Sequence, residues 1–172
     1  MIADRPRRHC DRPIPPVPDA WPQGFHYLAA PYTATTRAVM AARAEATATA
    51  AGQLWTTLGA RVVLYAPTVA GNAMVRAAPH LRGLGWEDWW RPVSAQAVLR
   101  AECVHVLLLD GWERSIVLAN VVRWTVEDRG MTVRAWRLGT GYPGDLKPAP
   151  PILPGDFSID ASRCCSLWHA LP

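Results

Sequence analysis

Apolar and polar positions alternate along the chain in blocks that predict strands and helices in turn. Short apolar runs bounded by Gly, Pro or polar residues, typical of β-strands, lie at 25–30, 61–66, 103–109 and 131–138. Helix patterns cover residues 33–58, 92–102 and 115–129. Gly59 and Gly130 follow two of these patterns directly and are expected to end the helices. Strands that alternate with helices predict an α/β fold.

The run at 103–109 is the most apolar of the four, which is typical of a central strand covered on both faces of a parallel sheet. We therefore expect a three-layer α/β sandwich of Rossmann or flavodoxin-like type. Its parallel sheet should have four to five strands, with any fifth strand in the C-terminal tail. Residues 68–85 are predicted to form a long loop with one helical turn around 74–78, and long connections are usually functional or mobile.

Proline and glycine clusters divide the chain into three parts. Residues 1–24 form a Pro- and Arg-rich arm, expected to be extended or disordered because proline removes backbone donors. Residues 25–138 hold all the predicted strands and helices. Residues 139–172 form a Gly- and Pro-rich tail, which either wraps the domain or hangs free. A chain of 172 residues is most simply one domain with two tails.

The turn at 110–115 is the first place to expect chemistry. It joins the most apolar strand to a long helix pattern, and ligands of open α/β sheets bind outside the carboxyl ends of the strands. Asp110 and Glu113 supply carboxylates there, Trp112 supplies a flat wall and Ser115 a hydroxyl. The alternative is that Asp110 only ends the strand and caps the helix, while Glu113 lies favourably in the first turn.

A second candidate lies where the first long helix begins. The helix N-terminus offers free N–H groups beside three threonine hydroxyls and Arg37, a combination that can receive an anion. The chain contains neither a G-x-G-x-x-G sequence nor a Walker-type lysine loop. The alternative is that the threonines at 33, 35 and 36 merely cap the helix.

Composition narrows the possible partners. The formal charge is +4, but the arginines are scattered among acids with no long run of like charge, so no strong nucleic-acid surface is predicted. No apolar run reaches the length of a membrane span, and we expect a cytoplasmic protein without membrane association. Some of the nine tryptophans can stack on a flat ligand, but most are expected in the core or an interface.

Cysteines and histidines give no sign of a metal or other cofactor. The cysteines do not have zinc-like spacing and are expected to be reduced thiols: Cys10, Cys103, Cys164 and Cys165. His26 and His105 lie within strand patterns and are expected to be core residues with satisfied hydrogen bonds. His80 lies in the long loop without a partner in the sequence pattern.

Several motifs together resemble the nucleoside 2-deoxyribosyltransferase-like superfamily, in particular its small uncharacterised bacterial and phage branch. The similarity covers residues 25–138. It is carried by Tyr27-Leu28-Ala29-Ala30-Pro31-Tyr32-Thr33, Arg37, Gly59-Ala60-Arg61-Val62-Val63, Pro67, a Trp within 86–90, Cys103 and Asp110-Gly111-Trp112-Glu113-Arg114-Ser115. The resemblance implies a nucleoside or nucleotide ligand, no cofactor, and a homo-oligomer. It implies substrate contacts at Tyr27, Ala30, Pro31, Tyr32, Arg37, Trp89, Trp112 and Ser115.

The resemblance also implies a pair of catalytic carboxylates for cleavage or transfer at an N-glycosidic bond. The family pattern Ser-x-Gly-x-x-x-Glu falls on Ser115, Val117 and Val121, and the earlier acid falls near Ser94. Two interpretations follow. The chain is an atypical transferase or hydrolase that uses Asp110 and Glu113, with further acids at Glu87 and Asp88. Alternatively, it is an inactive nucleotide-binding, regulatory or accessory protein.

Overall fold

The computed structural model describes residues 12–14, 16, 21–78, 80, 91–139 and 144–159. Trp89, Glu87, Asp88 and three of the four cysteines therefore lie outside the described residues. The sheet consists of β1 (Gly24–Ala29), β2 (Val62–Tyr65), β3 (Cys103–Leu107), β4 (Val133–Leu138) and β5 (Leu146–Ala149). The helices are α1 (Arg37–Leu58), α2 (Pro67–Ala77), α3 (Arg91–Arg100) and α4 (Ile116–Arg123). Short helical turns occur at η4 (Trp112–Arg114), η5 (Trp124–Asp128) and η6 (Pro154–Asp156).

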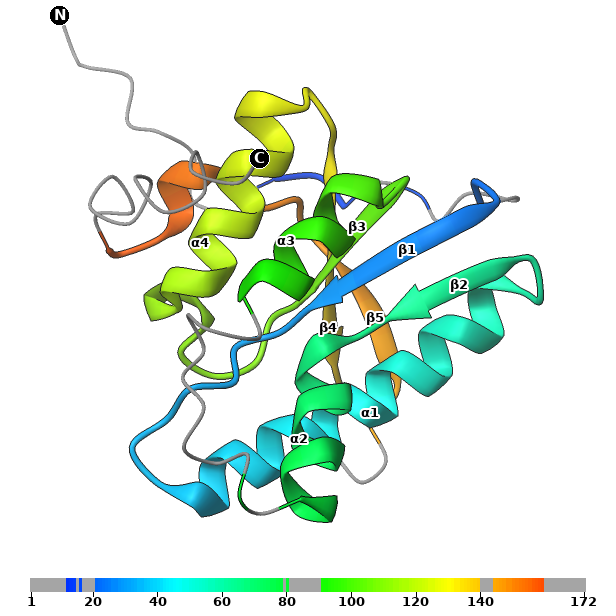
Figure 1. The fold of residues 1–172 in the computed structure, drawn as a ribbon. Helices are drawn as coiled ribbons and strands as arrows, with labels where there is room; N and C mark the ends of the chain where they lie inside the picture. The colour runs from blue at the N-terminus through cyan, green and yellow to red at the C-terminus, as the bar shows by residue number, and fades with distance from the viewer. Residues whose placement is uncertain are drawn as a thin grey trace, which may run out of the picture.

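The five strands form one sheet in the order β2-β1-β3-β4-β5 (Figure 1). The first four strands are parallel, as the sequence predicts, whereas β5 pairs antiparallel with β4. The expectation of an all-parallel sheet is therefore wrong at this edge. The connection over residues 139–145 is too short for a crossover, which needs about a dozen residues or more. A strand that follows so closely can only return antiparallel.

The alternation of side chains along the strands builds a core on each face of the sheet. On one face, Leu28 and Leu107 pack with Leu54 of α1. On the other face, Tyr27 and Val106 belong to a larger cluster to which α3 and α4 contribute. Figure 1 accordingly shows α3 and α4 on one side of the sheet and α1 on the other. All five residues of β3 are buried, as expected for a central strand covered twice.

Helix α1 is built from a narrow buried stripe in an alanine-rich sequence. Its buried residues recur at three- and four-residue intervals, so they share one face: Ala44, Thr47, Ala50, Leu54 and Leu58. The Thr36 side chain accepts a hydrogen bond from the Val39 N–H and begins the helix. Gly59, with φ of 85°, donates its N–H to the Trp55 carbonyl and ends it, as predicted.

Two elements differ from the sequence prediction. Helix α2 occupies residues 67–77, where a loop with one helical turn was expected. Pro67 stands at the start of α2, where a missing N–H costs nothing, and α2 packs against α1. The predicted helix over 115–129 is present, but it changes from α-helical to π-helical geometry at Trp124. Within the described residues, no helix has both the length and the apolar character needed to cross a membrane.

Candidate functional site

The strand order β2-β1-β3-β4-β5 places the switch point of the doubly wound fold at the carboxyl ends of β1 and β3, and we call this position the crevice between β1 and β3. Helix α1 follows β1 and covers one face of the sheet, whereas α4 follows β3 and covers the other. The two connections therefore diverge at this point. Such a divergence is where open α/β sheets bind their ligands. The structure brings the two predicted regions together here, namely the segment after β1 and the turn after β3.

Arg43 of α1 joins the two regions directly. Its Nη1 donates to the Thr33 carbonyl at 2.6 Å, and its Nη2 donates to the Asp110 carbonyl at 2.7 Å. Only two of the five guanidinium donors are needed for these two bonds. Arg43 was missed in the sequence because a single arginine in an alanine-rich helix has no motif to mark it. The sequence shows only that Arg43 lies about two turns after the start of α1.

Gly111 shapes the turn after β3. Its φ of 79° is left-handed, a conformation that glycine adopts without the steric penalty of a side chain. A Cβ atom at this position would lie 3.4 Å from Nη2 of Arg43 and 3.7 Å from Nη2 of Arg114. Arg43 and Arg114 therefore each place a guanidinium nitrogen beside Gly111. Two cations near the same residue favour the binding of an anion there.

Both predicted catalytic carboxylates lie on this turn and are exposed. The Asp110 side chain is exposed, and the carbonyl of the same residue accepts from Arg43. The side chain of Glu113, the residue after Trp112, is also exposed. Asp110 does not cap the following helix. Ser115 does so instead, because its Oγ accepts from the Leu118 N–H at 3.4 Å. The capping interpretation of Asp110 is thus wrong. Ser115 caps α4, and its predicted contact with substrate stays a prediction.

Trp112 does not wall the crevice. Only 6% of its surface is exposed, and its ring packs edge-on against Phe157 with centroids 5.4 Å apart. The Ser158 N–H and Oγ both donate to the Glu113 carbonyl, at 3.0 and 3.3 Å. Phe157 and Ser158 therefore contact the turn directly and stabilise it.

The predicted contacts on the β1 side are divided between core and surface. Tyr27, Ala30 and Pro31 are buried. The Tyr32 hydroxyl reaches Asn72 of α2 at 3.5 Å, and Arg37 is exposed at the first position of α1. Of these five predicted contacts, Tyr32 and Arg37 are thus the two with accessible polar atoms.

The positions at which the resemblance expects catalytic acids lie in the core. Ser94 and Val121 are each 1% exposed, and Val121 shares a cluster with Tyr27. Burial raises the pKa of the Tyr27 phenol, and the neighbouring Ser94 hydroxyl offsets part of the rise without reaching hydrogen-bond geometry. Neither Ser94 Oγ nor Asn120 Oδ1 has a hydrogen-bond partner within the described residues. The positions to which the resemblance assigns acids therefore hold packed, neutral side chains.

A buried cluster of His26, Cys103 and His105 has its potential ligand atoms within 4.8 Å of one another. The Trp136 indole N–H donates to Nδ1 of His105 at 3.0 Å, which places the His105 proton on Nε2. That Nε2–H then donates to Nδ1 of His26 at 3.0 Å, and the His26 Nε2–H donates to the Pro22 carbonyl at 2.9 Å.

The cluster is therefore a hydrogen-bond chain with every proton assigned, and it does not fit a metal ion. A metal on Nε2 of His105 would require Nδ1 to carry the proton, opposite the Trp136 N–H. Burial and the neighbouring His26 and Arg134 lower the pKa of His105 to about 3. Burial also lowers the pKa of His26 and raises that of Cys103. The expectation that both histidines are satisfied core residues is confirmed.

A shallow apolar groove of about 700 Å³ runs along α3 on the face of the sheet opposite α1. Its rings are Phe25 and Tyr65, with centroids 6.2 Å apart. One face of α3 supplies the remaining lining: Pro92, Val93, Gln96, Ala97 and Arg100. In the part of the chain that the structure describes, none of the predicted site residues lines this groove. It is therefore separate from the crevice between β1 and β3.

Comparisons with protein-family models, with curated proteins and with solved structures find no match to this chain.

Proposed function

We propose that the chain binds a nucleotide, a nucleoside carrying a phosphate, in the crevice between β1 and β3. The observation that carries the proposal is the approach of both the Arg43 and the Arg114 guanidinium groups to Gly111. Guanidinium groups are well suited to phosphate because their fork of N–H donors matches its oxygens. The phosphate would lie near the start of α1, where Arg37 and free N–H groups add favourable charge.

The fold supports this location. The order β2-β1-β3-β4-β5 matches the flavodoxin-like doubly wound arrangement in its first four strands, and that arrangement binds its ligand at the β1/β3 divergence. We infer a three-layer sandwich of this class. The sequence resemblance to nucleoside 2-deoxyribosyltransferase-like proteins supplies the nucleoside part of the proposal. Tyr32 borders the crevice and is the aromatic side chain best placed to contact the ligand.

A second candidate function is catalysis at the N-glycosidic bond of the same ligand. The observation that favours it is the exposure of both Asp110 and Glu113 on one turn at the crevice. One carboxylate would stabilise the anomeric carbon while the other would protonate the leaving base. The burial of Ser94 and Val121 favours binding without catalysis, because the family's own acid positions cannot contribute.

The binding proposal is tested by calorimetric titration of the purified protein with 5′-nucleoside monophosphates and the matching nucleosides. Nucleotides should bind more tightly, and Arg114→Gln should weaken nucleotide binding on the order of tenfold, as expected for loss of one charge-assisted contact. Arg61→Gln is the matched control and should leave the affinity for nucleotides unchanged. Arg61 is exposed and precedes β2, at the amino-terminal end of the parallel strands and away from their carboxyl ends. Equal affinity for nucleosides, or no effect of Arg114→Gln, would overturn the proposal.

The catalytic candidate has its own test. The protein is incubated with nucleosides and 5′-nucleotides, and free base is measured by chromatography. If the reaction occurs, Glu113→Gln and Asp110→Asn should each slow base release by a factor of about 10²–10⁴, the usual contribution of a general acid or base. Nucleotide binding without release of base from any substrate would leave the binding function and eliminate the catalytic one.

A further inference from the structure

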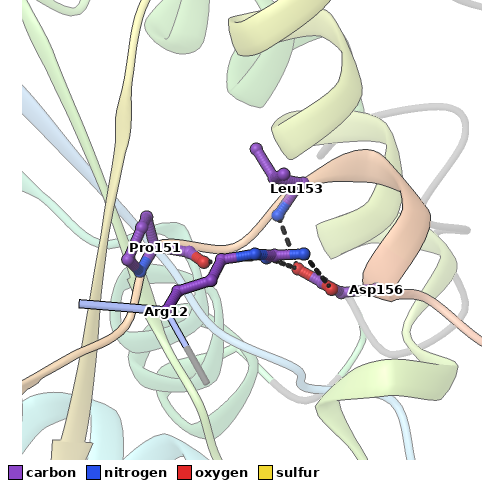
Figure 2. A network of polar contacts seen from close by, with 4 residues as sticks. All are labelled: Arg12, Pro151, Leu153 and Asp156. Carbon is purple, nitrogen blue, oxygen red and sulfur yellow. Dashed lines mark hydrogen bonds and ion pairs between the residues drawn. The ribbon is translucent and has the colours of Figure 1, made fainter. Parts of the chain in front are cut away.

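Arg12 contacts the C-terminal segment through an ion pair with Asp156. Figure 2 shows the Arg12 guanidinium facing the Asp156 carboxylate. Nη2 donates to Oδ1 of Asp156 at 2.9 Å, Nη1 donates to Oδ2, and Nη1 also donates to the Pro151 carbonyl at 3.0 Å. The side chains are only 16% and 9% exposed. A two-pronged contact that is shielded from water is far more specific than an exposed ion pair.

Asp156 also shapes the chain around it. Its carboxylate accepts the Leu153 N–H at 2.7 Å, while the Asp156 N–H donates to the Leu153 carbonyl at 3.0 Å. These reciprocal bonds close the η6 turn, visible beside the guanidinium in Figure 2. Arg12 therefore binds the same carboxylate that stabilises the η6 turn.

The residues immediately after Asp156 support the candidate site. Phe157 is 9% exposed and packs against Trp112, and Ser158 donates twice to the Glu113 carbonyl. Ile152, before the turn, is 1% exposed in the same core cluster. The contacts thus run without a break from Arg12, through Asp156 and its two successors, to the turn that carries Gly111 and Glu113.

We propose that the ion pair between Arg12 and Asp156 acts as a latch that positions the Gly111–Glu113 turn. Arg12 and Asp156 are positioning residues, since neither is among the residues proposed to bind the ligand. When the latch is intact, Phe157 stays packed against Trp112, and the turn that carries Arg114 keeps its position. Loss of the latch lets η6 open and frees the turn to move. The positioning of a ligand by this turn rests on the proposed nucleotide-binding function, but the mobility of the turn does not.

The test measures hydrogen exchange in the full-length protein by mass spectrometry, without ligand, for Arg12→Gln and Asp156→Asn. Peptides over residues 108–116 report the turn, because the Trp112, Arg114 and Ser115 N–H groups are bonded within it. Exchange there should accelerate on the order of tenfold in either variant, and the double variant should add little, because both changes break one contact. Asp145→Asn, an exposed acid just before β5, is the matched control and should exchange as wild type does.

Two results would overturn the latch. One is unchanged exchange over residues 108–116 in both variants. The other is faster exchange by the same factor throughout the sheet, which would make the contact a general stabiliser and not a positioning device. Nucleotide titration of the same variants separates the two proposals. Failure of the wild-type protein to bind nucleotides would overturn the proposed function alone, whereas wild-type turn mobility in the variants would overturn the latch alone.

Discussion

The buried histidine pair makes the stability of this protein depend on pH. Trp136, His105, His26 and the Pro22 carbonyl form a chain in which each nitrogen is already a donor or an acceptor. A further proton on His105 would place an N–H on Nδ1, opposite the Trp136 N–H. A further proton on His26 would place one on Nδ1, opposite the His105 N–H. Both histidines are 0% exposed, so water cannot relieve either conflict.

The size of the effect follows from the pKa of His105. It is about 3 in the folded protein, against 6.5 in the unfolded chain. Between these values the unfolded state binds more protons, so the free energy of unfolding rises with pH. The contribution is complete above pH 6.5 and is lost as the pH falls towards 3. At 1.36 kcal/mol per pH unit, acidification to pH 5 should remove about 2 kcal/mol. The lowered pKa of His26 acts in the same direction.

Other groups also titrate in this range, so the groups nearby must be considered. Glu102 favours the charged form of His26, and Arg134 disfavours the charged form of His105. Cys103 has its pKa raised by burial and stays neutral through the window. A variant is therefore needed that removes one titration. His105→Asn suits this purpose, because the asparagine Oδ1 takes the place of Nδ1 and can accept from Trp136.

The assay is urea denaturation followed by tryptophan fluorescence at half-unit steps from pH 7.5 to 4.5. Wild-type protein should lose stability on acidification with a slope near one proton or more. His105→Asn should be less stable at neutral pH but should lose less with acidification. His80→Asn, at an exposed position, is the control and should keep the wild-type slope. The reasoning is refuted if wild-type stability is flat from pH 7 to 5, or if His105→Asn keeps the full slope.

Two further substitutions test the fold by urea denaturation. Gly111→Ala forces an L-residue to φ of 79° and brings a Cβ to 3.4 Å from Arg43, so it should cost roughly 1–2 kcal/mol or more. Gly52→Ala, inside α1 with nothing within 4 Å, should instead stabilise by about 0.5–1 kcal/mol, and the same sign for both would contradict the account. Leu54→Ala removes a side chain that is 0% exposed and should cost about 2–5 kcal/mol. Val39→Ala, on the same helix but 43% exposed, should change stability by no more than about 0.5 kcal/mol, and a similar loss in both would be inconsistent with the assigned core.

The sequence predicted the elements whose signals are local. The apolar run that begins at Cys103 predicted the central strand, because a nearly continuous run of apolar residues indicates burial on both faces. Gly59 predicted the end of α1, because glycine favours the positive φ found there. Helix α2 was missed because it depends on packing against α1, and its own sequence contains Gly71 and Pro67. The direction of β5 was missed because the position of a fifth strand within the tail was not predicted, so the short connection that forces an antiparallel return was not recognised.

The sequence indicates where the candidate site lies in the fold, but not how its side chains are arranged. The turn at 110–115 does lie at the β1/β3 crevice, since the rule for parallel sheets depends only on strand order. The burial of Trp112 could not be foreseen, because Phe157 lies in a segment with no strand or helix pattern. The contribution of Arg43 was equally hidden, because its two carbonyl partners come from segments distant in sequence.

The central claim, that a nucleotide occupies the crevice between β1 and β3, is tested most directly by hydrogen exchange with and without a saturating 5′-nucleoside monophosphate. The account predicts that the nucleotide slows exchange over residues 30–37 and 108–116, the two segments joined by Arg43. Protection over residues 92–100 instead, along the groove beside α3, would contradict the claim, as would the absence of protection anywhere in the chain.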